Sequence, residues 1–165
     1  KTTEARIVKM DSRRTIELLI SYHPNYHGGG ADALIDGIRG SENWRLGGWQ
    51  GYQGVDFEAT VDLGQEEQLH SLSAGFVQDI RSWIWMPKTV TFSVSTDGKK
   101  FKKLADLSHK ISPEIEGIFK QDIGQKINEK ARYVRVQATN FGTIPSWHLG
   151  SGGQAYIFID EINIE

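Results

Sequence analysis

Hydrophobic and polar residues alternate along several short stretches of the chain, which is the pattern of β-strands with one buried face. In 55–64, five apolar side chains fall on one face and acidic or hydroxyl side chains on the other. The inward set is Val55, Phe57, Ala59, Val61 and Leu63. Further strands are predicted at 15–21, 68–79, 117–124, 131–139 and 154–165, and 88–104 is predicted to be an antiparallel pair of strands.

These strands predict the fold class. They amount to about eight strands with no amphipathic helix longer than a turn or two, which indicates an all-β antiparallel sandwich of jelly-roll type. Asp97-Gly98 is a strong hairpin signal. Residues 22–54, rich in glycine and aromatics, are expected to form a long structured loop. We expect 1–14 to be a tail from a preceding domain and 15–165 to be one β-sandwich module.

Composition removes several classes of partner. The 165 residues are 38% hydrophobic, enough for one domain. A net charge of −2 without a basic run argues against nucleic acid. No stretch approaches the ~20 apolar residues that cross a bilayer, so we expect no membrane partner and a monomer. The first ten residues lack the apolar core of a signal peptide, so an export signal would lie outside this sequence. Without cysteine there are no disulfides and no thiolate sites.

No catalytic residues are predicted. Gly28, Gly30 and Ala33 have the spacing of a dinucleotide-binding loop, but that motif needs a strand before it and a helix after it, and neither is expected here. Asp160 and Glu161 are neighbours in a predicted strand, so their side chains should leave opposite faces and cannot act as an acid and base pair.

The segment 31–41 is a candidate cation site. It is a turn-rich loop that exposes backbone carbonyls beside one carboxylate, Asp36, and one hydroxyl, Ser41. Calcium binds oxygen ligands of this kind. An equally good interpretation is that Asp36 caps the turn through its own backbone, and the spacing alone does not separate the two.

The tryptophans are the candidate ligand-binding residues, because most lie in glycine-rich or proline-flanked loops rather than in strands. They are Trp44, Trp49, Trp83, Trp85 and Trp147. A sugar presents a C–H face to an aromatic ring and hydroxyls to planar partners such as Gln50, His148 or Arg81. If 82–87 is extended, two rings share one face with Ile84 on the other. Packing beneath a loop remains open for any single tryptophan.

Several motifs resemble those of the discoidin, or coagulation-factor type C, family. They are "ALIDG…W…VDLG", "VTFSVSTDGKKF", "ARYVRVQAT" and a terminal "IDEINIE", and they cover about 15–165. More narrowly, the chain resembles the family 32 carbohydrate-binding modules of bacterial glycoside hydrolases, most of all the C-terminal module of bacterial β-N-acetylhexosaminidases (chitobiases). The resemblance implies a jelly-roll sandwich with sugar-binding loops at one end and a structural calcium near the first loop.

Matching the family's motifs to this chain gives the expected site residues. The calcium ligands would be the carbonyls of Ala33 and Ile38 and the side chains of Asp36, Ser41 and Glu161. Ile38 stands where many relatives have a second acid, which should weaken affinity. The sugar loops give Trp49, Gln50, Trp83, Trp85, Trp147 and His148. Trp44 is left out, because it resembles the tryptophan that packs beneath the first loop.

The expected function is a non-catalytic module that binds terminal galactose or N-acetylhexosamine and holds an attached glycoside hydrolase near its glycan. Such a shallow site should bind at about 0.1 to 1 mM. The absence of a disulfide clamp suits a bacterial source, with a periplasmic, cell-surface or secreted location. The alternative is a structural or protein-interaction module that packs against the neighbouring catalytic domain. The first hypothesis requires the loop tryptophans to lie at the surface, gathered at one rim.

Overall fold

The computed structural model describes residues 13–165, so the predicted tail lies outside the described residues except for its last two positions. Seven strands are found in this part of the chain. They are β1 (Thr15–Leu18), β2 (Gln50–Gln53), β3 (Phe57–Gln78), β4 (Val90–Ser95), β5 (Lys102–Leu107), β6 (Phe119–Ala138) and β7 (Tyr156–Ile164). Three short 3₁₀ helices accompany them: η1 (Ala31–Ile35), η2 (Trp44–Leu46) and η3 (Ile80–Ser82).

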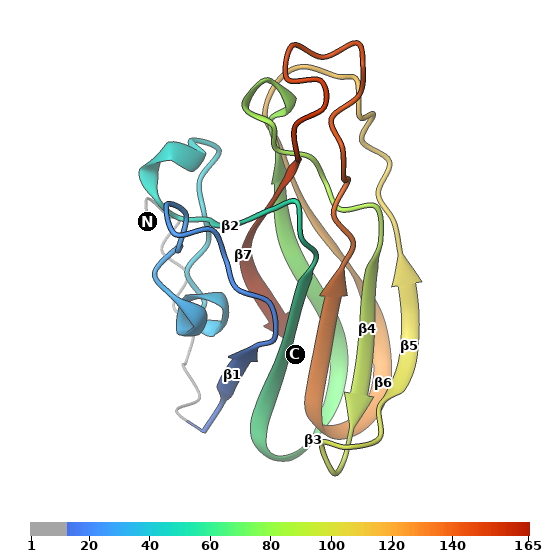
Figure 1. The fold of residues 1–165 in the computed structure, drawn as a ribbon. Helices are drawn as coiled ribbons and strands as arrows, with labels where there is room; N and C mark the ends of the chain where they lie inside the picture. The colour runs from blue at the N-terminus through green and yellow to red at the C-terminus, as the bar shows by residue number, and fades with distance from the viewer. Residues whose placement is uncertain (1–12) are drawn as a thin grey trace.

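All strand pairs are antiparallel, in the order β2-β7-β3-β6-β4-β5, with β1 beside β3. The strands β3 and β6 are long because each runs through both layers of a sandwich. The first half of β3 pairs with the second half of β6, and the second half of β3 pairs with the first half of β6. Register shifts at 62–71 mark the bend between these halves, and Figure 1 shows both strands curving round at its lower end.

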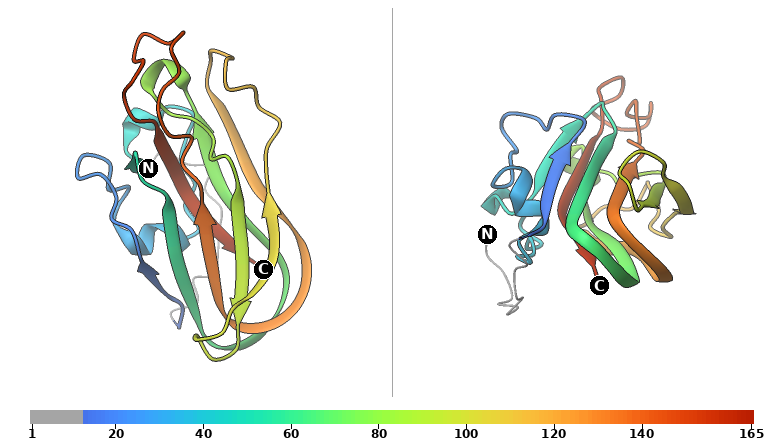
Figure 2. Two further views of the ribbon diagram at one scale, coloured as in Figure 1. Left: turned by 45° about the vertical axis from the view of Figure 1, so that its right-hand side comes forward. Right: turned by 90° about the horizontal axis from the view of Figure 1, so that it is seen from below.

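The two layers follow from this exchange. One contains β1, the first half of β3, the second half of β6, β4 and β5; the other contains β2, β7 and the remaining halves of β3 and β6. Their strands can be followed from the side and from below in Figure 2. The predicted all-β antiparallel sandwich is therefore confirmed.

The core lies between the layers and is filled by the inward faces that the alternation predicts. Phe57, Ala59, Val61 and Leu63 are buried. So are Val90, Phe92 and Val94 of β4, and Val134, Val136 and Ala138 of β6. Val55 is exposed and was placed wrongly, because β3 begins only at Phe57.

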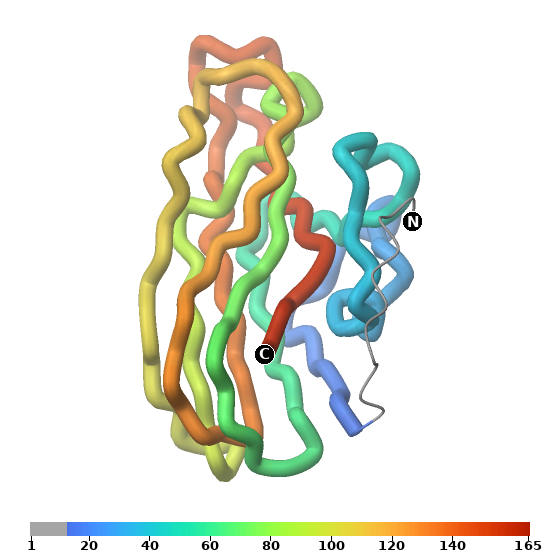
Figure 3. The backbone as a smooth tube through the Cα atoms, turned by 180° about the vertical axis from the view of Figure 1, so that it is seen from behind, coloured from blue at the N-terminus to red at the C-terminus, as the bar shows by residue number. Residues whose placement is uncertain are grey.

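The segment between β1 and β2 lies against the edge of the sandwich beside β7, as Figure 3 shows from behind. The loop predicted at 22–54 includes one strand, β2, near its end. The loops 79–87, 108–118 and 139–155 gather at one end, at the top of Figure 1. Among the described residues no helix is long and apolar enough to cross a membrane.

Candidate functional site

Edge-to-face and tilted aromatic contacts anchor the loop between β1 and β2 to the start of β7. The ring of Tyr26 lies 5.4 Å from that of Tyr156 and 5.1 Å from that of Phe158, measured between centroids. The Trp44 ring lies 5.4 Å from Phe158 with their planes at 89°. Each such pair adds about 0.5–1.5 kcal/mol beyond area burial, so the loop is held in one conformation although most of it is not strand.

A hollow of about 170 Å³ opens beside this aromatic cluster. Trp44 and Tyr26, both partly exposed, supply its apolar wall, while Asn25, His27 and Arg45 supply polar groups. The guanidinium of Arg45 lies over the Trp44 ring, 4.3 Å from its centroid, a cation–π contact that fixes the position of the charge.

Asp79, just before η3, holds Trp44 and Ser82 in place through hydrogen bonds. Its side chain is buried, and its Oδ2 accepts hydrogen bonds from Trp44 Nε1 at 3.0 Å and from Ser82 Oγ at 3.1 Å. Arg45 Nη2 donates to Ser82 Oγ at 3.3 Å. One buried carboxylate therefore joins η2 to η3, although the two elements are far apart in the sequence.

A second, larger hollow of about 580 Å³ adjoins the first and shares Arg45 with it. Asp79, Arg81 and Ser82 line it from η3, and Glu116, Gly117 and Ile118 line it from the segment before β6. We call the two hollows together the loop groove. It combines a partly exposed indole with guanidinium, hydroxyl and carboxylate groups, which is the chemistry needed to bind a polyhydroxylated ring.

A second aromatic group, which we call the apex cluster, fills the space between the loops 80–86 and 141–153. Trp85 stacks on Phe141 with centroids 5.0 Å apart, and its Nε1 donates to the Pro113 carbonyl at 2.9 Å. Ile80, Ile144 and Ala155 complete the buried part, with Trp83 packed against it.

Of the predicted sugar residues, Trp49, Gln50 and Trp85 are buried, at 2%, 1% and 1% exposure. For Gln50 and Trp85, which line neither hollow, the prediction that they offer a surface to a ligand is wrong. Trp49 is mostly covered but is one of the residues that line the smaller hollow, so its assignment as a sugar contact stays a prediction. Trp49 donates through Nε1 to the Ser41 carbonyl at 2.8 Å. The Gln50 amide binds the carbonyls of His27 and Gly30 and accepts from the Tyr52 hydroxyl, so its hydrogen bonds hold the loop.

The segment of Trp83 and Trp85 is not extended as the prediction required, because Trp83 ends η3 in the left-handed conformation with a φ of 69°. The two rings still pack in the apex cluster, apart from Ile84, and Trp83 is only partly exposed. An added Cβ at Gly150 or Gly153 would stand 2.6 and 2.7 Å from the Trp83 ring. The two glycines therefore let the loop close over this ring.

His148 and Trp147 end in different environments. Both ring nitrogens of His148 contact backbone, Nε2 at 2.7 Å from the Ile80 carbonyl and Nδ1 accepting from Gly150 N at 2.8 Å. The imidazole is therefore engaged within the protein. Trp147 is 51% exposed, and its assignment as a sugar contact stays a prediction.

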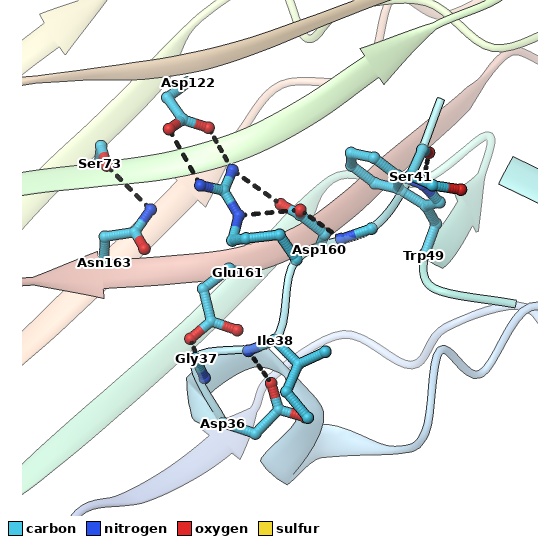
Figure 4. Close-up of polar contacts among 12 residues, drawn as sticks. Asp36, Gly37, Ile38, Ser41, Trp49, Ser73, Asp122, Asp160, Glu161 and Asn163 are labelled. Atoms are coloured by element: carbon cyan, nitrogen blue, oxygen red, sulfur yellow. Dashed lines mark hydrogen bonds and ion pairs between the residues drawn. The ribbon is translucent and has the colours of Figure 1, made fainter. Parts of the chain in front are cut away.

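The predicted cation residues surround η1 and its following turn. Asp36 Oδ1 accepts from Ile38 N at 2.8 Å, which is the turn-capping interpretation. Glu161 Oε2 accepts from Gly37 N at 2.8 Å. Figure 4 shows Asp36, Ile38 and Glu161 together at the turn, and Ser41 beside Trp49.

The oxygen donors fit a hard cation in kind, with carboxylates and the carbonyls of Ala33 and Ile38. Within residues 13–165, no three His, Cys, Asp or Glu side chains gather as a metal-binding group. Ser41 Oγ donates to the Asn43 carbonyl. The charged oxygen ligands in the set are the carboxylates of Asp36 and Glu161, and calcium binding stays a prediction.

A β-bulge places both Asp160 and Glu161 toward this first loop. The register moves from Ala74 opposite Ile162 to Phe76 opposite Ile159, so two residues of β7 face one position of β3, Gly75. The expectation that the neighbouring carboxylates leave opposite faces is thus wrong: both hydrogen-bond to the segment 37–40.

Arg39 clamps this segment to the sheet. Its guanidinium binds the buried Asp160 through Nε at 3.0 Å and also pairs with Asp122 of β6, as Figure 4 shows. Burial lowers the pKa of Arg39, but the two carboxylates outweigh it and hold that pKa above its ordinary value. An added Cβ at Gly75 would collide with all three side chains, so glycine leaves the room that this ion pair fills.

The groove residues that the sequence did not indicate are Tyr26, Arg45 and Asp79, and Trp44 was set aside as a packing residue. Trp44 does pack on Phe158, as expected, but part of its ring also faces the groove. The pairing of Trp44 with Asp79 leaves no local pattern in the sequence, so only the fold could reveal it.

Comparison with known proteins gives a family and a set of structural neighbours. The F5/8 type C domain profile matches residues 19–156. A search of curated proteins finds no significant match. Among solved structures, CpGH89CBM32-5 of Clostridium perfringens, in complex with GalNAc-β-1,3-galactose, has a TM-score of 0.55 at 16% identity, covering 92% of this chain and 94% of its own.

Two further neighbours have the same fold. The family 32 CBM of C. perfringens NanJ, in complex with galactose, has a TM-score of 0.57 at 12% identity, with 93% of both chains covered. The CBM32 of AlyQ, in complex with 4,5-unsaturated mannuronic acid, has a TM-score of 0.52 at 14% identity, covering 92% of this chain and 93% of its own. At these identities the likeness shows the fold alone.

Proposed function

The chain belongs to the F5/8 type C domain family, and from that premise we propose that it is a non-catalytic carbohydrate-binding module whose ligand lies in the loop groove. The observation that carries the proposal is the contact between Trp44 and Asp79. A buried carboxylate holds an indole at the wall of a solvent-open hollow, beside Arg45 and Ser82. Preorganised aromatic and polar groups of this kind suit a sugar ring.

The structural neighbours support the same class of ligand, because three of them were solved with a bound sugar or disaccharide. One neighbour comes from a family 31 glycoside hydrolase, and another is a whole fucosidase. We therefore propose that this module is attached to a glycoside hydrolase in a bacterial extracytoplasmic or secreted protein. A β-N-acetylhexosaminidase is our proposed parent enzyme, on the motifs of its sequence, and galactose or N-acetylhexosamine the proposed terminal sugar.

A glycan array followed by calorimetric titration tests the proposal. The module should bind at least one terminal sugar at about 0.1 to 1 mM. Arg45→Ala should weaken binding about tenfold or more, since it removes a charge-assisted hydrogen-bond donor from both hollows. Lys99→Ala is the matched control, because Lys99 is an exposed cation on the β4–β5 turn at the opposite end of the sandwich. Failure to bind any glycan on a broad array would refute a sugar-binding function.

A second function is favoured by the exposed apolar residues near the apex. Trp147 is half exposed and Leu149 fully exposed, two residues apart in one loop. Large apolar side chains at a surface are typical of protein interfaces. If the module packs on the neighbouring catalytic domain instead, replacing both residues by Ser should weaken association with that domain supplied in trans, while the array stays silent.

We also propose a weak calcium site at the turn after η1, with Asp36 and Glu161 as its charged ligands and the carbonyls of Ala33 and Ile38 as further oxygens. A bound calcium would neutralise these carboxylates and tie the first loop to β7. Calcium should raise the melting temperature by a few degrees and a chelator should reverse it, since a ligand that binds only the folded state stabilises it. Glu161→Gln should abolish the response; a calcium response of equal size in that variant would exclude the site.

A further inference from the structure

Two arginines line the larger hollow of the loop groove. Arg45 comes from η2 and Arg81 from η3, and both are exposed. No ion pair involves either guanidinium within residues 13–165. By contrast, Arg39 pairs with Asp160 and Arg132 pairs with Asp62.

The hydrogen bonds of Arg45 leave most of its donors for a ligand. Among the residues that the structure describes, its guanidinium donates one hydrogen bond, from Nη2 to the Ser82 hydroxyl at 3.3 Å. The cation–π contact with Trp44 and the hydrogen bond to Ser82 hold the guanidinium at the edge of the hollow, where its remaining N–H groups can reach a ligand. A planar fork held in this way matches the two oxygens of a carboxylate, and Arg binds carboxylates in that bidentate form.

Two acidic residues at the same hollow must be counted against this charge. Asp79 is buried, and its Oδ2 already accepts from Trp44 and Ser82, so its charge is directed into the protein. Glu116 is exposed on the segment before β6 and lies within ion-pair distance of neither arginine. Its carboxylate therefore opposes the two guanidiniums through solvent and does not neutralise either of them by direct contact, so Arg45 and Arg81 remain the cationic groups that line the hollow.

We infer that the loop groove prefers an acidic sugar, a hexuronic acid or a similar carboxylated residue, over its neutral counterpart, an inference that rests on the proposed sugar-binding function. The sugar ring lies at the Trp44 wall, and its carboxylate is bound between Arg45 and Arg81. The larger hollow is thus the part of the site that selects for charge.

Titration calorimetry with matched sugar pairs tests the inference on the whole module. The probes are galactose with galacturonic acid, glucose with glucuronic acid, and mannose with mannuronic acid, which differ only at C6. At least one acid should bind about fivefold or more tighter than its neutral partner, as charge-assisted hydrogen bonds are roughly twice as strong as neutral ones. The advantage should shrink between 20 and 500 mM salt, by screening of an exposed site.

Two variants locate the effect. Arg81→Gln should reduce the ratio of acidic to neutral affinity to about one, whereas Glu116→Gln should increase it, because it removes the opposing charge. Lys99→Gln, which removes an exposed cation far from the groove, should leave the ratio as in the wild type. A thermal melt of each variant shows that the fold is kept.

Each outcome decides the inference. An acidic preference that Arg81→Gln removes supports it. If neutral sugars bind and no acid binds more tightly, or if the preference survives Arg81→Gln, the inference is wrong while the sugar-binding function stands. If none of the six sugars binds and the glycan array is silent, the proposed function fails together with it.

Discussion

The loop groove and the apex cluster are both built from loop tryptophans, yet they differ in how the rings are used. In the apex cluster Trp85 is covered by Phe141 and by the loop that carries Pro113, so its whole surface packs. In the groove Trp44 is packed on one edge by Phe158 and held at Nε1 by Asp79, while part of its ring faces a hollow.

The difference shows that a loop position does not by itself expose an aromatic ring. What decides exposure is whether a second loop closes over the ring, and small residues permit that closure. Gly150 and Gly153 bring their backbone onto Trp83. Over Trp44 lies the guanidinium of Arg45 instead of a loop backbone, and this exposed charged group leaves the ring partly accessible.

The largest expected effect comes from removing the ring at the centre of the apex cluster. Trp85→Ala should destabilise the fold by about 3–5 kcal/mol, the usual cost of deleting a buried aromatic side chain. Sugar affinity should change little, because the ring does not reach the groove. Chemical denaturation and titration of the same protein check both results. If the variant is stable but no longer binds sugar, Trp85 is a ligand-binding residue and the proposed difference between the two regions is wrong.

Breaking the clamp beneath the first loop should be next in size. Arg39→Ala leaves the buried Asp160 carboxylate without its cation, which should cost about 3 kcal/mol. Because the clamp holds the segment that leads into η2, groove binding should weaken as well, in contrast to Trp85→Ala. Urea denaturation gives the stability, and the matched variant Arg132→Ala, whose partner Asp62 is more exposed, should lose much less.

A smaller change should open the apex cluster without deleting a ring. Gly150→Ala places a Cβ 2.6 Å from the Trp83 indole, so the loop must shift, at a cost of about 1–3 kcal/mol. The Trp83 ring should become more accessible to solvent. Fluorescence quenching by acrylamide should then rise relative to the wild type. Gly142→Ala, where no heavy atom lies within 4 Å of the added Cβ, separates steric contact from backbone strain, since Gly142 has a positive φ and Gly150 does not.

The smallest expected effect is a loss of stability at acid pH that arises at Asp97, outside the loop groove and the apex cluster. Backbone N–H groups of Lys100 and Lys99 hold the pKa of Asp97 below its usual value in the β4–β5 turn. Its stabilisation is therefore complete above the unfolded pKa, near pH 4, and is lost as the pH falls through the lower folded pKa. Asp97→Asn should flatten the decline of melting temperature below pH 4. An unchanged slope would place the acid sensitivity elsewhere.

The sequence alone predicted most of the sandwich. Alternation with a period of two is a local property, and it assigned the buried faces of β3, β4 and β6 correctly. Asp97-Gly98 also forms the predicted turn, with Gly98 at a φ of 76°. By contrast, β2 was hidden among glycines and aromatics, because a strand of four residues is too short to show a period.

The tertiary structure decided the site. Burial of Trp49, Gln50 and Trp85, and the exposure of part of Trp44, depend on which distant loops lie against them. The bulge at Gly75 turned two neighbouring carboxylates toward one loop, against the strand rule. A strand pattern records which face of a segment meets the core, because neighbouring residues alternate; whether a loop side chain meets protein or water is fixed by contacts between segments far apart in the chain, and those exist only once the sandwich has formed.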